Sequence, residues 1–207
     1  MGAGRLNPVG RFAGYTWGTL VHPAVIFRRL AQEERTGQGW AAVLLLGILY
    51  SVVCAIASLR GIEPVTAPIL PISEESYYFW EIFFGPPLFI GVWYLFSYLN
   101  LRLGRAFGGE GTFKAILAPL GFALCIPMLP IMWTTDLICI AFMIDLRATG
   151  TFGQIWNIFY QAFTILWVIA ACVIATREAH HISLGKAIAT TIISSLPVAV
   201  IIAATVR

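Results

Sequence analysis

The chain has very little charge. Asp, Glu, Lys and Arg make up 11% of its 207 residues, 59% are hydrophobic, and the mean hydropathy is +0.84. A soluble domain carries about 25% charged residues. So few charged side chains cannot cover a water-facing surface, which excludes a soluble globular protein and indicates an integral membrane protein. The formal net charge of +3 is small and does not indicate a nucleic-acid partner.

Motifs for catalysis and metal binding are also missing. None of the four cysteines is spaced as C-x-x-C, so neither a zinc site nor a redox pair is indicated. The glycines of residues 104–111 are followed by no Lys-Ser/Thr pair, which favours a tight turn over a phosphate cradle. His180 and His181 would point about 100° apart on a helix, which favours a polar pair over a metal site. We therefore predict that the protein is not an enzyme and holds no cofactor or metal.

What the sequence has is long apolar runs. A membrane-crossing helix needs about 20 mostly apolar residues, and residues 40–59, 80–101, 155–175 and 187–206 meet that length. Residues 113–146 are apolar too, but prolines interrupt them. We predict that 113–133 crosses as a helix kinked near Pro127. Residues 137–144 are too short to cross, and could be an interfacial piece, a re-entrant piece or an extension of that helix.

The basic residues support five crossings. Cytoplasmic loops of membrane proteins carry an excess of Lys and Arg. With five crossings, ten of the 13 basic residues fall on one side: Arg5, Arg11, Arg28, Arg29, Arg35, Arg102, Arg105, Lys114, Arg177 and Lys186. This bias predicts a multi-pass protein with its N-terminus in the cytoplasm and its C-terminus outside. We expect it to reside in a prokaryotic inner membrane. We expect a cytoplasmic segment 1–38, without a cleaved signal peptide, and a membrane domain 39–207.

The N-terminal segment contains an amphipathic pattern. Pro23 suits the first turn of a helix over residues 24–34. Phe27 can share an apolar face with its neighbours, while Arg28 and Arg29 lie on a polar face. The pattern predicts either an interfacial helix on the cytoplasmic leaflet or an ordinary amphipathic helix packed on the ends of the spans. Overall, the predicted fold is all-α: a five-span bundle with an N-terminal amphipathic interfacial helix and a proline-kinked third span.

Four short motifs recur in the order found in a known family. They are Leu20-Val21-His22-Pro23 with Phe27-Arg28-Arg29-Leu30, then Gly108-Gly109-Glu110-Gly111-Thr112-Phe113-Lys114, then Leu120-Gly121-Phe122-Ala123 with Ile126-Pro127, and last Ser183-Leu184-Gly185-Lys186-Ala187. On these motifs the chain resembles the Yip family of five-span membrane proteins that interact with Rab/Ypt GTPases. The likeness covers about residues 16–205, and the short N-terminal segment is closer to the prokaryotic branch.

The resemblance implies a protein of membranes and partners. Family members with known roles act in vesicle traffic and bind small GTPases. Those proteins carry a long N-terminal region with an acidic Asp-Leu-Tyr-Gly-Pro-like motif. This chain has no such motif. The resemblance therefore supplies the fold and a membrane role, while the partner has to be sought in the residues.

Three groups of candidate site residues follow. The broken third span holds Gly121, Phe122, Pro127 and Pro130, which either form a site or only shape the bundle. Glu81, Asp136 and Arg147 would lie toward the outer side, either solvated at the interface or meeting in a polar cavity. The candidate cytoplasmic face for a partner or lipid comprises Pro23, Phe27, Arg28, Arg29, Gly108, Gly109, Lys114 and Lys186.

Two functions fit these groups. The first is a non-enzymatic membrane scaffold or organiser that binds a protein or an anionic lipid at its cytoplasmic face. The second is a small transporter or channel with a path along the broken third span. The partners expected are the lipid bilayer, an anionic lipid or another protein, and no nucleic acid. Small residues at four-residue spacing, Gly47 and Ser51 among them, predict packing faces within the bundle or between copies of a homo-oligomer.

Overall fold

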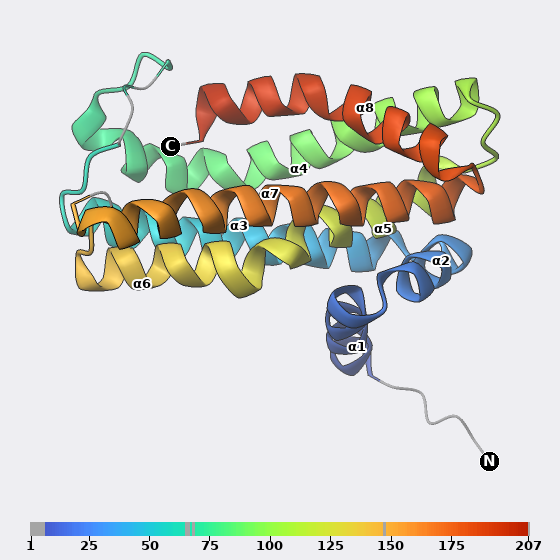
Figure 1. Ribbon diagram of the computed structural model, residues 1–207, viewed down its shortest axis with the longest axis horizontal. Helices are drawn as coiled ribbons and strands as arrows, with labels where there is room; N and C mark the ends of the chain where they lie inside the picture. Colours follow the sequence, from blue (N-terminus) through green and yellow to red (C-terminus); the bar gives the residue numbers. More distant parts are fainter. Residues whose placement is uncertain (1–6, 65–66, 68, 147, 207) are drawn as a thin grey trace.

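Long helices lie side by side in one bundle (Figure 1). The computed structural model describes residues 7–64, 67, 69–146 and 148–206. Within these ranges, five helices are long and apolar enough to cross a membrane: α3 (Thr36–Leu59), α4 (Glu74–Ala106), a composite helix (Phe113–Phe142), α7 (Gly150–His180) and α8 (Leu184–Thr205). The predicted all-α, five-span architecture is confirmed.

The third spanning helix is continuous but irregular. It consists of α5 (Phe113–Cys125), a 3-10 turn η1 (Ile126–Met128), a π-helical turn η2 (Leu129–Trp133) and α6 (Thr134–Phe142). Pro127 lies in the 3-10 turn and Pro130 in the π turn. Since proline has no N–H to donate, the regular hydrogen-bond pattern cannot pass through them. Residues beyond 134 extend this helix to Phe142, so they form no separate interfacial or re-entrant piece.

A side chain hydrogen-bonds to the backbone within this irregular stretch. The Thr134 hydroxyl donates to the Leu129 carbonyl over 2.9 Å. Within a bilayer a backbone carbonyl without a partner costs several kcal/mol, because no water is present to replace the lost bond. Of the two prolines, Pro127 is buried and Pro130 is exposed.

The first half of this helix lies at the centre of the bundle. α5 packs against α3, α4 and α7. Glycines permit the closest approach, which is between α3 and α5: a Cβ on Gly39 would lie 2.8 Å from the Cα of Ala118, and one on Gly121 would lie 3.0 Å from the carbonyl oxygen of Gly39. On the α4 side, the Trp93 indole donates to the Leu117 carbonyl over 3.0 Å. These contacts fix α5 between its neighbours.

The small residues of α3 also face a neighbouring helix. A Cβ on Gly47 would lie 3.2 Å from the Cα of Pro86 on α4. The Ser51 hydroxyl donates to the carbonyl of Ile82, also on α4, over 2.9 Å. This stripe therefore packs within the bundle and leaves no flat small-residue face at these positions for a second copy.

Two short helices precede the bundle. α1 (Pro8–Val21) begins at Asn7, whose side chain accepts from the backbone N–H of Gly10, and His22 separates it from α2 (Pro23–Glu33). Phe27 and Leu30 on α2 are fully buried, because α2 packs against α5 and α7. The apolar face of this amphipathic helix therefore packs on the bundle.

α1 is the more exposed of the two, and projects from the side of the bundle (Figure 1). Its inner side contacts the bundle through Tyr15, whose ring lies 6.1 Å from that of Phe122 on α5. Tyr15 also donates to Glu33 on α2 over 2.7 Å. The pKa of Glu33 is raised by burial, but its hydrogen bonds with Arg29 and Tyr15 outweigh this and hold it below the usual value. Glu33 is therefore a charged link between the two N-terminal helices.

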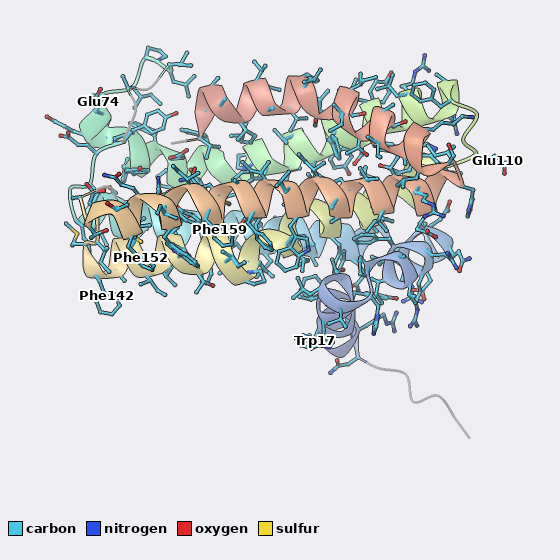
Figure 2. All side chains as sticks on the ribbon, viewed as in Figure 1. Trp17, Glu74, Glu110, Phe142, Phe152 and Phe159 are labelled. Carbon is cyan, nitrogen blue, oxygen red and sulfur yellow. The ribbon has the colours of Figure 1, made fainter. Side chains whose placement is uncertain are left out.

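The outer side of α1 is apolar. Val9, Trp17 and Val21 are all exposed, with Trp17 at 70%, and Figure 2 shows Trp17 on the projecting part of the molecule. Together with Ala13 they form a series at four-residue spacing, Val9, Ala13, Trp17 and Val21, so they lie along one face of the helix. This is an apolar helix face that no other described segment covers.

Candidate functional site

One end of the bundle gathers most of the exposed cations. We define the basic end as the end where residues 107–112 join α4 to α5 and residues 181–183 join α7 to α8. Figure 2 shows Glu110 at this end and Glu74 at the opposite one. The exposed basic side chains on the elements that meet here are Arg28, Arg29, Arg35, Arg102, Arg105, Lys114, Arg177 and Lys186.

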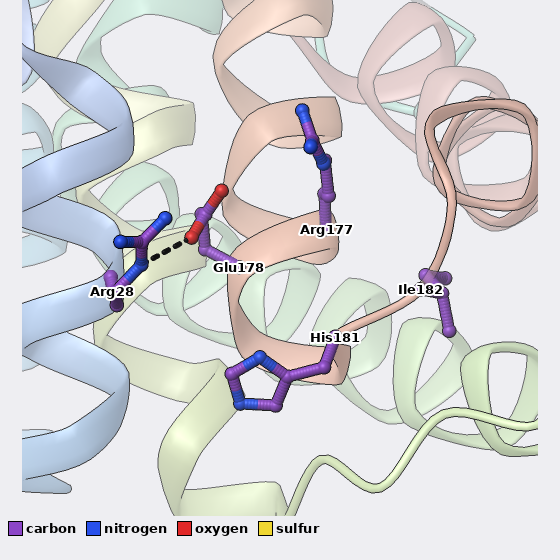
Figure 3. A pocket seen from close by; sticks show the side chains of 5 residues that line it. All are labelled: Arg28, Arg177, Glu178, His181 and Ile182. Carbon is purple, nitrogen blue, oxygen red and sulfur yellow. Dashed lines mark hydrogen bonds and ion pairs between the residues drawn. The ribbon is translucent and has the colours of Figure 1, made fainter.

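A polar hollow opens at the basic end, between α2 and the end of α7. It has a volume of about 270 Å³ and is lined by Arg28, Arg177, Glu178, His181 and Ile182 (Figure 3). The Arg28 guanidinium donates through Nε to Glu178 over 2.7 Å. Glu178 is nearly buried while Arg28 is largely exposed, so the carboxylate sits in the wall and the guanidinium faces outward.

Arg177 is the other cation of this hollow. It is exposed, and its guanidinium makes no hydrogen bond or ion pair with any residue that the structure describes. In Figure 3, Glu178 lies between the Arg28 and Arg177 side chains. The arrangement thus offers one neutralised and one free guanidinium, a combination suited to an anion and to the planar oxygens of a phosphate.

A second hollow adjoins the first and shares Glu178 and His181 with it. Its volume is about 230 Å³, and it is also lined by Ala31 and Gln32 of α2 and by the loop residues Glu110, Gly111 and Thr112. Thr112 caps α5 by accepting from the backbone N–H of Ala115, and its hydroxyl donates to Glu34. Helix α2 and the 107–112 loop therefore form the walls of a shared groove at the basic end.

The 107–112 loop is built around a buried histidine. His180, the last residue of α7, is 1% exposed. A Cβ on Gly109 would lie 2.7 Å from its Nδ1, one on Gly111 2.8 Å from the same atom, and one on Gly104 would overlap the ring. The peptide N–H of Glu110 also donates to the His180 carbonyl over 3.2 Å. The glycines of this loop are thus required by the imidazole ring that they enclose.

Below this histidine the helices meet through buried polar side chains. Asn100 of α4 donates to Thr176 of α7 over 2.9 Å, and Thr176 lies 3.2 Å from Thr191 of α8. Neither ring nitrogen of His180, nor the Asn100 side-chain oxygen, reaches a hydrogen-bond partner among the described residues. Polar contacts of this kind hold membrane helices together, because lipid offers no competing partner.

The predicted cytoplasmic face is only partly gathered into this site. Arg28 lines the first hollow, and Phe27 anchors the helix that carries it. The remaining residues lie around it: Pro23 starts α2, Arg29 pairs with Glu33, Gly108 turns the loop with a φ of +87°, Gly109 covers His180, Lys114 is exposed on α5, and Lys186 donates to the Phe107 carbonyl.

The sequence placed Arg177 on the predicted cytoplasmic side, but it did not indicate that Glu178 would pair with Arg28. Arg28 and Glu178 are 150 residues apart, and no local pattern relates them. The only available signal was that Arg177-Glu178 places two charged residues at the end of a long apolar run. The buried His180 was recognised only as part of a polar pair, since its glycine neighbours come from another loop.

The two described carboxylates of the predicted outer site turn to different partners. Glu81 is fully buried on α4, with one carboxylate oxygen 3.9 Å from Cys54 Sγ on α3. Asp136 accepts a 2.9 Å hydrogen bond from Tyr160 on α7. Arg147 lies outside the described residues. Of the broken-span candidates, Gly121 and Phe122 serve packing against α3 and α1, and neither hollow at the basic end reaches Pro127 or Pro130.

The architecture defines the protein as a polytopic α-helical membrane protein. Comparison with protein families then narrows this class, since the family model described as the Yip1 domain matches residues 17–206. The chain therefore belongs to the Yip family. No curated protein and no solved structure matches it.

Proposed function

We propose that the protein is a non-enzymatic organiser of the membrane that binds a lipid or protein partner at its basic end. The observation that carries this proposal is the pair of adjoining hollows around Glu178 and His181, which lie where the exposed cations gather. Membership of the Yip family supports a membrane role of this type. The positive-inside rule favours a cytoplasmic location for the basic end, hence for the N-terminus, in a prokaryotic inner membrane.

The proposal predicts that the basic end determines which lipids or proteins co-purify with this protein. We expect the wild type, extracted in native nanodiscs, to carry a reproducible set of lipids or proteins. The double variant Arg28→Gln/Arg29→Gln should lose at least one component several-fold, because it removes two exposed charges and the pairing of Glu178. Quantitative lipidomics and proteomics of the nanodiscs measure this.

The matched control is Arg60→Gln. Arg60 is exposed and follows α3 at the opposite end, so this variant removes a charge away from both hollows. It should leave the set of accompanying molecules unchanged. Identical compositions for the wild type, the double variant and the control would refute the proposed function.

A second candidate, a small transporter or channel, has one observation in its favour. Glu81 is fully buried in a helix long enough to cross the membrane, and ionisable residues at such positions are often functional. This reading predicts solute or ion flux into proteoliposomes that is lost in Glu81→Gln. Absence of flux under ion and pH gradients, with correctly folded protein, would rule it out and leave the organiser as the sole candidate.

A further inference from the structure

The first hollow at the basic end combines anion-binding groups with an apolar approach. We propose that Arg28 and Arg177 bind the phosphate of an anionic membrane lipid there, while the acyl chains of that lipid lie against the apolar face of α1. The inference rests on the proposed function and deepens it, since it names the class of partner that the basic end binds.

The two guanidinium groups have donors to spare. Arg28 uses only Nε in its bond to Glu178, and its side chain makes no other hydrogen bond within the described ranges, which leaves its terminal nitrogens available. Arg177 has all of its donors available in the same hollow. Arginine binds phosphate through two parallel N–H groups, so a phosphate between these side chains would receive bonds from both.

Glu178 sets the strength of this site. Its carboxylate competes with an incoming phosphate for Arg28, and its charge repels the anion. The hollow therefore suits a ligand that is concentrated at the surface, as lipid headgroups are, better than a dilute solute. Removing this carboxylate is expected to strengthen the binding of an anion, an effect opposite in sign to that of removing an arginine.

Exposed apolar residues on the two N-terminal helices favour a lipid as the source of the phosphate. Trp17 and Val21 are exposed on α1, and Val25, at 64% exposure, lies on α2 one turn before Arg28. Tryptophan is favoured at the level of lipid headgroups, and exposed valines are favoured among acyl chains. A soluble phosphate compound or an acidic protein segment would use the arginines but not this surface.

The height of α1 along the bundle agrees with this placement. Tyr15 packs on Phe122, which lies nine residues into α5, about 14 Å along the helix from its start near the basic end. Arg28 is paired with Glu178, which lies only three residues before His181, where the α7–α8 turn begins. The arginine is therefore closer to the end of the bundle than the apolar helix is, as a headgroup is closer to water than its acyl chains.

The test measures lipids retained by the purified full-length protein. Protein is reconstituted in nanodiscs of phosphatidylcholine with one-fifth phosphatidylglycerol, and native mass spectrometry counts the phosphatidylglycerol molecules that stay bound. An arginine near an anionic surface contributes about a fivefold effect on binding. We expect about fivefold lower retention for Arg177→Gln, a comparable loss for Arg28→Gln, and higher retention for Glu178→Gln.

Lys114→Gln is the matched control for charge. Lys114 is exposed on α5 but lines neither hollow, so its loss should leave retention nearly unchanged. Equal losses for Lys114→Gln and Arg177→Gln would show general surface attraction and overturn the site. Competition by millimolar inorganic phosphate that displaces all of the lipid would overturn the role assigned to α1.

The outcome separates this inference from the proposed function. If native nanodiscs show a protein partner that depends on Arg28 and Arg29, while phosphatidylglycerol retention is the same in every variant, the lipid inference fails and the organiser remains. If no component of any kind depends on these arginines, both fail. Each variant must keep a thermal midpoint within a few degrees of the wild type. We expect this above all of Arg177→Gln, which removes no side-chain hydrogen bond or ion pair among the described residues.

Discussion

Replacing Gly104 by alanine is expected to destabilise the protein by about 2 kcal/mol, within the range seen when a methyl group is forced into a packed core. The new methyl group would overlap the ring of His180, which is 1% exposed and is also enclosed by Gly109 and Gly111. The ring cannot swing aside, because these glycines close the space on the other sides. The thermal midpoint in detergent, followed by near-ultraviolet circular dichroism, measures the loss.

Two further variants identify the cause. Gly91→Ala lies on the same helix, where a Cβ would meet nothing within 4 Å, so it should be neutral or stabilising by up to about 1 kcal/mol through helix propensity. In the double variant Gly104→Ala/His180→Ala the overlap disappears. Its loss of stability should therefore be smaller than the sum of the losses in the two single variants. Simple additivity in this cycle would contradict the enclosure of His180 by the glycine loop.

The five crossings could be predicted because they depend on one-dimensional signals. The length of an apolar run and the side on which its flanking arginines fall are both readable without knowing which helices touch. The same reasoning found the weak point at Pro127 and Pro130. It could not decide the form of residues 134–142, since a proline can end a helix or be absorbed by a 3-10 and a π turn. Here η1 and η2 contain the two prolines, and the helix continues beyond them as α6 to Phe142.

The site at the basic end was less predictable, because its residues come together only through packing. Arg28 was recognised as an exposed cation of an amphipathic helix, but its partner Glu178 lies 150 residues away. The glycines of the 107–112 loop looked like turn residues, whereas three-dimensional contact gives Gly109 and Gly111 a second role around His180. Sequence patterns show which residues can turn or carry charge, and packing then decides what they meet.

Replacing Gly39 by alanine is expected to have the largest effect on the bundle, about 3 kcal/mol or more of lost stability. The new methyl group would lie 2.8 Å from the Cα of Ala118 and 3.2 Å from the Leu117 carbonyl oxygen, both of them backbone atoms that move only if α3 and α5 separate. Small residues permit such close packing of membrane helices, and lipid supplies no hydrophobic force that would restore it. Thermal unfolding of the purified protein measures the effect.

Gly37→Ala is the matched control, since a Cβ at Gly37, two residues earlier on α3, would meet nothing within 4 Å. It should leave the thermal midpoint unchanged or raise it slightly. Gly121→Ala approaches the same crossing from α5, so combining it with Gly39→Ala should cost less than the sum of the two. Because α5 begins at the Thr112 cap that lines the second hollow, separating α3 from α5 should also weaken whatever binds at the basic end. A Gly39→Ala protein as stable as Gly37→Ala would show that the two helices do not cross at these glycines.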